Sequence, residues 1–329
     1  MNYAIVMAAG KGTRMKTAKA KTMHELLGKP MVGRIYDTLK ACGVDEIVFV
    51  VGHGHEQIEN YLQDRVSYAI QQPQLGTGHA VMQARQLSGR KGKTLIINGD
   101  CPLISVQTYQ KLLQEADESQ MAVMTMVFDD PANYGRIVRD ETGQVLRIVE
   151  KRDASEEQLR IKEVNAGIYC ADNELLWKYL PEINNENNQH EYYITDLIEI
   201  FNRHGHRVSA VIAEDAGEMQ GINSRRELAM ATRWLSEKTN NALMDSGVTI
   251  IDPSRTLISP EVRVGQDTVI YPNVRIEGDT VIGENCIIEE GCVLINCRIG
   301  NGVHIVSSRL IDCEVSDSSQ VYDRHVSEL

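Results

Sequence analysis

The sequence predicts an α/β protein in which a domain with a mixed, mostly parallel sheet is followed by a short left-handed parallel β-helix. Two observations lead to this prediction. In the first part of the chain, short apolar segments alternate with segments of helical spacing, as they do in parallel sheets that helices cover on both faces. After Gly247, aliphatic residues recur at every sixth position, which is the repeat of a β-solenoid.

The composition favours a two-domain globular protein without polyanionic partners. A chain of 329 residues exceeds one ordinary hydrophobic core. Its formal net charge of -12 argues against binding to nucleic acid or to an anionic membrane face. The seven cysteines form no CxxC pair and fit no zinc pattern, so we expect packing residues with free thiols. With no apolar signal or membrane-spanning segment, we expect a cytoplasmic location.

The first part of the chain gives clear element signals. Strands are expected at 3–7, 46–51, 66–70 and 94–97, and helices at 31–41, 55–62 and 78–87. The stretch 121–213 is richer in strands, which are expected at 136–138, 146–149 and 164–170 and extend the sheet over one side of a cleft. A long helix is expected at 224–244. We therefore predict an α/β domain at 1–223, a linker helix at 224–247 and a β-helix at 248–329.

The six-residue repeat defines the residues that fill the solenoid axis. They are Val264, Ile270, Ile276, Ile282, Ile288 and Leu294, then, after a slip of one residue, Ile299, Ile305 and Ile311. Ordinary alternating strands would not keep this period. Roughly three coils are expected, and their open ends need cover from the long helix or from another subunit.

A glycine-rich loop after the first strand carries five basic residues, Lys11, Arg14, Lys16, Lys19 and Lys21. Met15 stands where a dinucleotide fingerprint needs its third glycine, and the loop lacks the Gly-Lys-Ser/Thr of a Walker motif. The remaining interpretation is a turn whose backbone N–H groups approach a phosphate, with basic side chains nearby. The alternative is a solvated basic loop.

A series of motifs resembles one known family along the whole chain. In order they are AAGKGTRM (8–15), Lys21, QLGTGHA (74–80), NGDCPL (98–103), YGRIV (134–138), IVEKRDA (148–154), EVNAGIY (163–169), EYYITD (191–196) and QGINSR (220–225). Together they are similar to the bacterial bifunctional UDP-N-acetylglucosamine pyrophosphorylase/glucosamine-1-phosphate N-acetyltransferases. The sequence departs from the family at Met7, Ala20 and Ala166, where the family usually has Leu, Pro and Thr. None of these departures changes a charged or ligating group.

The resemblance implies a Rossmann-like nucleotidyltransferase domain that makes UDP-N-acetylglucosamine and pyrophosphate from UTP and N-acetylglucosamine 1-phosphate for cell-wall peptidoglycan precursors. It also implies Mg²⁺ as cofactor and a homotrimer formed through the β-helix. Arg14, Lys21 and Asp100 are the implied catalytic residues, with Asp100 and Asn223 as the metal ligands. The implied nucleotide-binding residues are Met7, Ala8, Ala9, Gly10, Gly12, Gln71, Gly76, Thr77, Asn98 and Gly99, and the implied sugar-binding residues are Gly135, Glu150, Asn165 and Asn223.

Several alternatives stay open at the sequence level. Asn223 is also well placed to cap the helix that follows it. A related sugar-1-phosphate nucleotidyltransferase with another sugar or nucleotide, or a non-catalytic nucleotide-sugar-binding subunit, would share the motifs. Histidines 24, 53, 55, 79 and 190 form no metal motif and are read as surface or satisfied polar residues. The family's acetyl-transfer site lies on coils beyond Leu329, and His304 is the single candidate base in the solenoid, so no acetyltransferase activity is expected in this chain.

Overall fold

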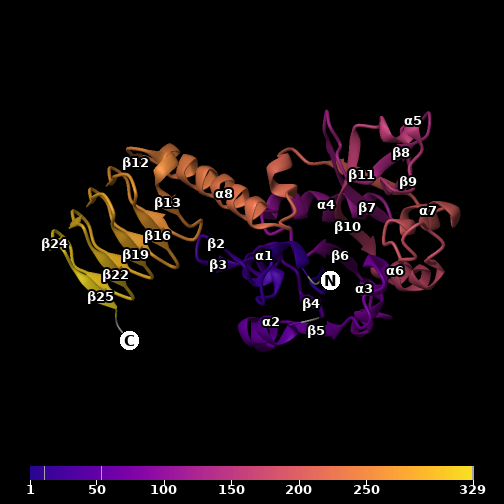
Figure 1. Cartoon of the computed structure of the whole chain (residues 1–329), viewed down its shortest axis with the longest axis horizontal. Coiled ribbons are helices and arrows are strands. Elements are labelled where there is room, and N and C mark those ends of the chain that lie inside the picture. The colour runs from indigo at the N-terminus through magenta and orange to yellow at the C-terminus, as the bar shows by residue number, and fades with distance from the viewer. Residues whose placement is uncertain (11, 53, 328–329) are drawn as a thin grey trace. The chain divides into compact units, whose positions relative to one another are not determined.

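The structure is a computed structural model that describes residues 1–10, 12–52 and 54–327 (Figure 1). Contacts divide the chain into two units. The first comprises Met1–His24 and Met31–Ser224, and the second comprises Glu25–Pro30 and the chain from Arg225 onward. The six residues Glu25–Pro30 had been assigned to the first domain from the sequence, whereas the structure groups them with the second unit.

The first unit is built on one mixed sheet in the order β11-β7-β10-β6-β1-β4-β5. Neighbours β6, β1, β4 and β5 are parallel. Strand β10 runs antiparallel to β6 and β7, and β8 and β9 extend the sheet beside it. This confirms the mixed, mostly parallel sheet. The strands are β1 (Asn2–Met7), β4 (Glu46–Val51), β5 (Ser67–Ile70), β6 (Lys93–Asn98), β7 (Met121–Val127), β8 (Arg136–Arg139), β9 (Val145–Val149), β10 (Glu163–Asp172) and β11 (Val208–Ile212).

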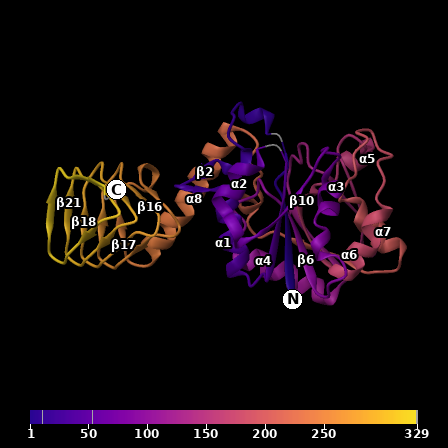
Figure 2. The same cartoon turned by 90° about the horizontal axis from the view of Figure 1, so that it is seen from below.

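Helices cover both faces of this sheet, as Figure 2 shows. Along β1, Ala4 and Val6 belong to one apolar cluster, and Tyr3 and Ile5 belong to the other. Side chains of successive strand residues point to opposite faces, so a strand covered on both sides reads as a continuous apolar run. The first cluster holds α1 (Met31–Ala41), α2 (His55–Leu62) and α4 (Val106–Glu118), and the second holds α3 (Thr77–Gln83), α6 (Asn173–Tyr179) and α7 (Asp196–Arg203).

One expected helix is shorter than the sequence suggested. Helix α3 ends at Gln83, and a separate 3₁₀ turn covers Arg85–Leu87. Ala84 between them has ψ 44°, which interrupts the helical backbone. The short helix α5 (Glu156–Leu159) was not expected, although Ser155 and Gln158 form a capping box at its start.

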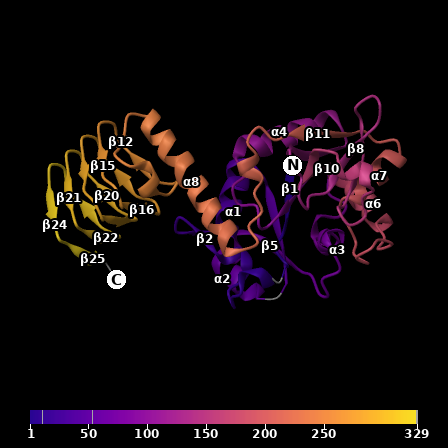
Figure 3. The same cartoon turned by 45° about the horizontal axis from the view of Figure 1, so that its top comes forward.

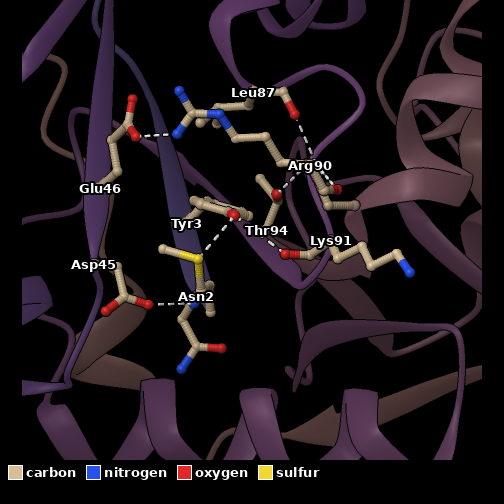
Figure 4. A network of polar contacts seen from close by, with 10 residues as sticks. Asn2, Tyr3, Asp45, Glu46, Leu87, Arg90, Lys91 and Thr94 are labelled. Carbon is tan, nitrogen blue, oxygen red and sulfur yellow. Dashed lines mark hydrogen bonds and ion pairs between the residues drawn. The ribbon is translucent and has the colours of Figure 1, made fainter.

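Polar contacts tie together the amino ends of the central strands (Figure 4). The carboxylate of Asp45 accepts from the backbone N–H of Asn2 at 2.8 Å, and Arg90 pairs with Glu46. The hydroxyl of Tyr3 donates to the carbonyl of Lys91 at 3.1 Å. These contacts hold the edge of the sheet that lies opposite the carboxyl ends of the parallel strands.

The second unit contains a parallel β-helix of hexapeptide repeats, of the left-handed type that such repeats form. Its short strands pair in three sheets of five, five and four strands within the described residues (Figure 3). These sheets correspond to four complete coils and two strands of a fifth, so the expectation of roughly three coils was wrong. The strands are β12 (Thr249–Ile250), β13 (Leu257–Ile258), β14 (Arg263–Val264), β15 (Val269–Ile270), β16 (Arg275–Glu277), β17 (Val281–Ile282), β18 (Ile287–Ile288), β19 (Val293–Ile295), β20 (Arg298–Ile299), β21 (His304–Val306), β22 (Arg309–Ile311), β23 (Glu314–Val315), β24 (Gln320–Tyr322) and β25 (His325–Ser327).

The predicted inward residues are buried except at the two ends of the series. Val264 is partly buried. The prediction for Ile311 is wrong, because Leu310 is 3% exposed and takes the inward position while Ile311 lies beside it. The strand register pairs Leu294 with Leu310, so a second one-residue slip follows Ile305. The sequence hid this slip because Leu310 and Ile311 are both aliphatic.

Cysteines pack inside the solenoid, as the sequence analysis expected. Cys286, Cys292 and Cys297 are fully buried in its apolar cluster. The thiol of Cys286 donates to the carbonyl of Gly300 at 3.1 Å, and that of Cys297 donates to the carbonyl of Leu310 at 3.3 Å. All seven cysteines are free.

Helix α8 (Arg225–Asp245) covers the first coil of the solenoid. The amide of Asn240 donates to the carbonyl of Thr256 at 2.9 Å, and the apolar side chain of Leu243 packs against the solenoid core. The hairpin of β2 (Glu25–Leu26) and β3 (Lys29–Pro30) joins this unit through the ion pair of Lys29 and Glu261, 2.9 Å long. In the described part of the chain, no helix has the length and apolar character needed to cross a membrane.

Candidate active site

A cavity of about 340 Å³ opens at the carboxyl ends of β1 and β6. In open α/β sheets this is where ligands bind. The residues that line it are Met7, Ala8, Ala9, Gly10, Lys21, Thr22, Gln71, Gln74, Gly76, Thr77, Ala80, Asn98, Asp100 and Glu191. They come from the glycine-rich loop, from the segment around α3, from the end of β6 and from the loop before α7.

Lys21, Asp100 and Asn223 meet at one point of this site. The Nζ of Lys21 lies 2.6 Å from Oδ2 of Asp100 and 3.1 Å from Oδ1 of Asn223. Asp100 follows β6, and the N–H of Ile222 donates to its backbone carbonyl at 2.9 Å, which fixes the segment that carries Asn223. The thiol of buried Cys101 lies 3.6 Å from the other carboxylate oxygen, and burial, followed by the charge of Asp100, raises the pKa of that thiol well above its usual range.

The glycine-rich loop packs closely on the site. Gly12 has φ 58°, and a Cβ there would lie 2.7 Å from the Cβ of Lys21, so glycine alone fits. Gly99 N–H donates to the carbonyl of Met7 at 2.9 Å, which joins the loops that follow β6 and β1. Arg14 is exposed and is not among the residues that line the cavity. Lys11 of the basic stretch lies outside the described residues.

Within residues 71–77, Gln71, Gln74, Gly76 and Thr77 form part of the cavity wall. Gln71 is 5% exposed, and its Nε2 donates to the carbonyl of Gly76 at 2.9 Å. A Cβ on Gly76, whose φ is 111°, would lie 2.5 Å from the carbonyl of Tyr192. The hydroxyl of Thr77 accepts from the N–H of Ile194 at 3.0 Å. The segment 191–194 therefore fixes the conformation of this wall.

Three of the four residues implied in sugar binding, Gly135, Glu150 and Asn165, lie next to one another, and none of these three lines the cavity. The N–H of Asn165 donates to the carbonyl of Gly135 at 2.9 Å, and a Cβ on Gly135 would lie 3.3 Å from Oε1 of Glu150. A bulge in β10 after Asn165 brings Gly167 against Asn98, where a Cβ would lie 2.3 Å from the Asn98 amide nitrogen. Asn98, which lines the cavity, thus lies next to the segment of β10 that carries Asn165.

Carboxylates gather beside Glu150. Burial, with smaller contributions from Asp153 and Asp196, raises the pKa of Glu150 above its ordinary value. Burial, with Glu199 and Asp153, raises the pKa of Asp196 to about 6. The described residues contain no group of three or more His, Cys, Asp or Glu side chains arranged to hold a metal ion.

The donor set nevertheless fits Mg²⁺, which usually takes one or two protein oxygens and completes its shell with phosphate and water. The oxygens of Asp100 and Asn223 both reach the Lys21 ammonium. They therefore converge closely enough to share one cation. A carboxylate and an amide oxygen are hard ligands of the kind that Mg²⁺ prefers.

Sequence reasoning missed four residues of the cavity wall, Thr22, Gln74, Ala80 and Glu191. Gln74 donates from its amide to the carbonyl of Ala9, which joins the segment 71–77 to the glycine-rich loop. It also missed His79, which lies against Gln71 at 3.2 Å. Gln74 and His79 both belong to the quoted motif QLGTGHA, and Glu191 opens EYYITD, so membership of a motif was the available signal.

Comparisons with known proteins agree with the fold. Residues 3–236 match a family model described as nucleotidyl transferase, and residues 261–296 match one described as bacterial transferase hexapeptide (six repeats). The chain is 44% identical over 322 residues to a protein named bifunctional protein GlmU from Lactobacillus delbrueckii subsp. bulgaricus, covering 97% of this chain and 70% of that protein. It is 47% identical over 318 residues to a protein of the same name from a Geobacillus species, covering 96% and 69%. For the Listeria monocytogenes serotype 4b protein of that name the identity is 42% over 322 residues, with 97% and 70% covered.

Proposed function

The chain belongs to the family of the bifunctional GlmU proteins, and on this premise we propose that it is the uridylyltransferase that makes UDP-N-acetylglucosamine and pyrophosphate from UTP and N-acetylglucosamine 1-phosphate. One observation carries the proposal. Lys21, Asp100 and Asn223 converge at a cavity that Gln71, Gly76 and Thr77 also line. The cavity thus combines a cationic, oxygen-rich group with polar residues of the kind that read a nucleotide base.

The reaction needs no nucleophile from the protein. An oxygen of the sugar phosphate attacks the α-phosphorus of UTP and forms a new P–O bond. The bond from that phosphorus to the β-phosphate oxygen breaks, and its electron pair leaves with pyrophosphate. Catalysis of this kind consists of positioning and charge stabilisation. In the proposal, Lys21, Arg14 and the N–H groups of the loop at Ala9, Gly10 and Gly12 bind the phosphates and stabilise the charge that develops on the leaving group.

Asp100 and Asn223 would hold Mg²⁺, which when bound supplies charge neutralisation to the phosphates. The oxygen of Asn223 accepts from Lys21, so the alternative in which Asn223 only caps helix α8 does not account for this side chain. Lys21, Asp100 and Asn223 are all present and in contact, which favours an enzyme over a non-catalytic binding subunit.

The remaining residues divide into two sets in the proposal. Gln71, Gly76, Thr77, Met7, Asn98 and Gly99 form the nucleotide side, with the glycine-rich loop. Gly135, Glu150, Asn165 and Asn223 form the sugar side, where the carboxylate of Glu150 accepts from sugar hydroxyls and Asn165 contacts the ring or its acetamido group.

The proposal extends to assembly and location. Hexapeptide repeats suggest an oligomer, and we propose a homotrimer through the β-helix. The free thiols are typical of a reducing compartment, so the proposed location is the cytoplasm. Acetyl transfer is not part of the proposal for residues 1–329. His304, the candidate base, lies with its Nε2 3.2 Å from Glu289 and its ring against Tyr322.

Release of pyrophosphate from UTP, N-acetylglucosamine 1-phosphate and Mg²⁺ tests the proposal. We expect turnover that stops when a chelator removes the metal. Glucose 1-phosphate in place of the acetylated sugar and ATP in place of UTP test the related nucleotidyltransferases. Faster turnover with either substitute would favour the alternative substrate, and no turnover with any pair would favour the non-catalytic subunit.

A further inference from the structure

The side-chain amide of Gln71 has its nitrogen and its oxygen in different surroundings. The nitrogen donates to the carbonyl of Gly76 at 2.9 Å and lies 3.2 Å from Nδ1 of His79. Among the described residues, no donor to the Gln71 side-chain oxygen is present. Because the residue lines the cavity, the oxygen is the group left to contact a ligand.

The carbonyl of Gly76 fixes which end of the amide is the nitrogen. An amide turned by 180° would place the oxygen of Gln71 beside the carbonyl oxygen of Gly76, and two acceptors at 2.9 Å repel each other. The second hydrogen of the amide nitrogen then points to His79, whose Nδ1 must accept it. A neutral imidazole has one acceptor nitrogen, so the proton of His79 resides on Nε2.

The surroundings of His79 support the neutral ring. Burial lowers the pKa of His79 below its ordinary value, which favours the form with an acceptor nitrogen. The other ring nitrogen lies 3.2 Å from the amide nitrogen of Gln83. That amide nitrogen also donates to the backbone carbonyl of His79 at 2.9 Å, and because a neutral ring has one acceptor nitrogen, only one of the two amides can donate to the ring. Gln83 is only partly buried and can move its side chain away from Nε2–H toward water, whereas Gln71 is 5% exposed and its amide nitrogen is held by the carbonyl of Gly76.

The ring of His79 is itself held in place. Its centroid lies 6.2 Å from that of Tyr192, and the backbone carbonyl of Tyr192 accepts from the N–H of Gly78 at 2.7 Å. The segment that fixes the loop at Gly76 therefore also fixes the residue that faces Gln71. This arrangement orients one amide from two sides.

We infer that His79 is a positioning residue that holds the oxygen of Gln71 toward the cavity, so that the site selects a base carrying an N–H donor at its pairing edge. Uracil carries such a donor at N3. Cytosine has an unprotonated N3 there, and its lone pair would face the oxygen of Gln71. Since a buried polar group left facing a like group is costly, the site rejects cytosine. This inference rests on the proposed function, because it takes Gln71 as the residue that contacts the base.

The test compares two single substitutions of His79 that should disturb the surrounding structure to a similar extent but differ in whether an acceptor is retained. His79→Phe keeps a ring against Tyr192 and removes the acceptor, whereas His79→Asn places an amide oxygen close to the position of Nδ1 and retains the acceptor. Equilibrium binding of UTP and of CTP, each with Mg²⁺, is measured by titration calorimetry without sugar phosphate. Turnover is measured in parallel for both nucleotides.

We expect the preference of the unaltered protein for UTP over CTP to fall about 10-fold in His79→Phe, the order of one misoriented hydrogen bond, and to be retained in His79→Asn. If His79 had only a structural role, its substitution would weaken the binding of both nucleotides equally. The ratio of the UTP and CTP affinities would then stay unchanged, which would overturn the inference. His79→Leu, judged by the same ratio, replaces His79→Phe if that variant does not fold. An unaltered protein that binds UTP and CTP alike would overturn the uracil-specific function and this inference together. An unaltered protein that prefers UTP, beside a His79→Phe variant that keeps the preference, would overturn this inference alone.

Discussion

The ammonium nitrogen of Lys21 lies 2.6 Å from Oδ2 of Asp100, and the two side chains are only 14% and 18% exposed. The pair joins the glycine-rich loop to the end of β6, two segments that are 79 residues apart in the sequence. Removal of one partner leaves the other as an unpaired charge in a largely buried place, which is costly. Variants at the two positions therefore act on one unit, and we expect their effects to be non-additive.

Asp100→Ala is expected to lower turnover by at least about 100-fold while the fold is kept, because it removes the carboxylate of the proposed metal site. Pyrophosphate release and circular dichroism measure the two quantities. Asp45→Ala is the matched control, since it removes an exposed aspartate that contacts Asn2 at the opposite edge of the sheet. Near-normal turnover in a folded Asp100→Ala protein would contradict the metal assignment.

Lys21→Ala is expected to lower turnover by at least about 100-fold, since it removes the cation proposed to meet the leaving pyrophosphate. The ion pair of Lys21 with Asp100 is largely buried. We therefore also expect a measurable loss of stability, reported by the melting temperature. Combination with Asp100→Ala should cost less stability than the sum of the two single changes. Stability losses that add up in the double variant would argue against the coupling of Lys21 and Asp100.

Arg14→Ala should affect phosphate binding without affecting stability, unlike Lys21→Ala. The side chain is exposed and does not line the cavity, so truncation should leave the melting temperature within about 1 °C, as is usual at exposed surface positions. We expect turnover to fall by about 10-fold or more if the guanidinium reaches the triphosphate when substrate is bound. Arg160→Ala, an exposed arginine on α5's C-terminal side, is the control. Unchanged turnover in Arg14→Ala would remove Arg14 from the proposed phosphate site.

Asp196→Asn tests the raised pKa beside the sugar side. The folded-state pKa of about 6 lies above the ordinary value of 3.8, so the folded protein binds the proton more tightly than the unfolded chain. Stability is then highest below the ordinary value and declines as pH rises through the folded one. Burial is the main cause of the raised pKa, and the charges of Glu199 on the same helix and of Asp153 add to it. Near pH 7.5 the neutral amide should raise the melting temperature by about 1–3 °C, a figure kept small because the group is partly solvated.

The gain from Asp196→Asn should disappear below about pH 4, where the aspartic acid is protonated in both states. Differential scanning calorimetry at the two pH values measures it. Asp129→Asn is the control, because Asp129 is an exposed carboxylate whose hydrogen bond with Lys162 lowers its pKa. It should give no gain in melting temperature at either pH value. A gain for Asp196→Asn that is equal at both pH values would mean that ionisation is not its cause.

Local patterns in the sequence predicted the elements, because the patterns depend on near neighbours. Residues 31–41 show helical spacing that ends just before Gly43, and α1 spans these same residues. The six-residue period likewise identified the solenoid. The slip at Leu310 could not be placed, because two adjacent aliphatic residues satisfy the period equally well and only the pairing with Leu294 decides between them.

Site geometry was harder to anticipate from the sequence, because it depends on contacts between distant segments. The family resemblance implied Gln71 and Asp100 as site residues, but nothing local linked Lys21 to Asn223, which are 202 positions apart. His79 was read as an ordinary polar residue. Its contact with Gln71 exists because the chain turns at Gly76, and Gly76 is held by the distant residue Tyr192. The hairpin at Glu25–Pro30 was missed because its strands have two residues each, too short for any periodic signal.

The β-helix is expected to make the protein a trimer in solution. Its flat sides carry exposed apolar side chains, among them Leu257, Ile287, Tyr322 and Val326, and apolar groups of this size on regular, flat sheets favour association. Light scattering at micromolar concentration should give three times the chain mass of 36.8 kDa. Ile287→Lys introduces a charge at the middle of one sheet, between Val269 and His304 of the neighbouring strands, and should shift the equilibrium toward monomer. Ile287→Leu keeps the apolar surface and should remain trimeric. A clean monomer for the unaltered protein would contradict the prediction, and a trimer that persists in Ile287→Lys would place the interface on another face of the solenoid.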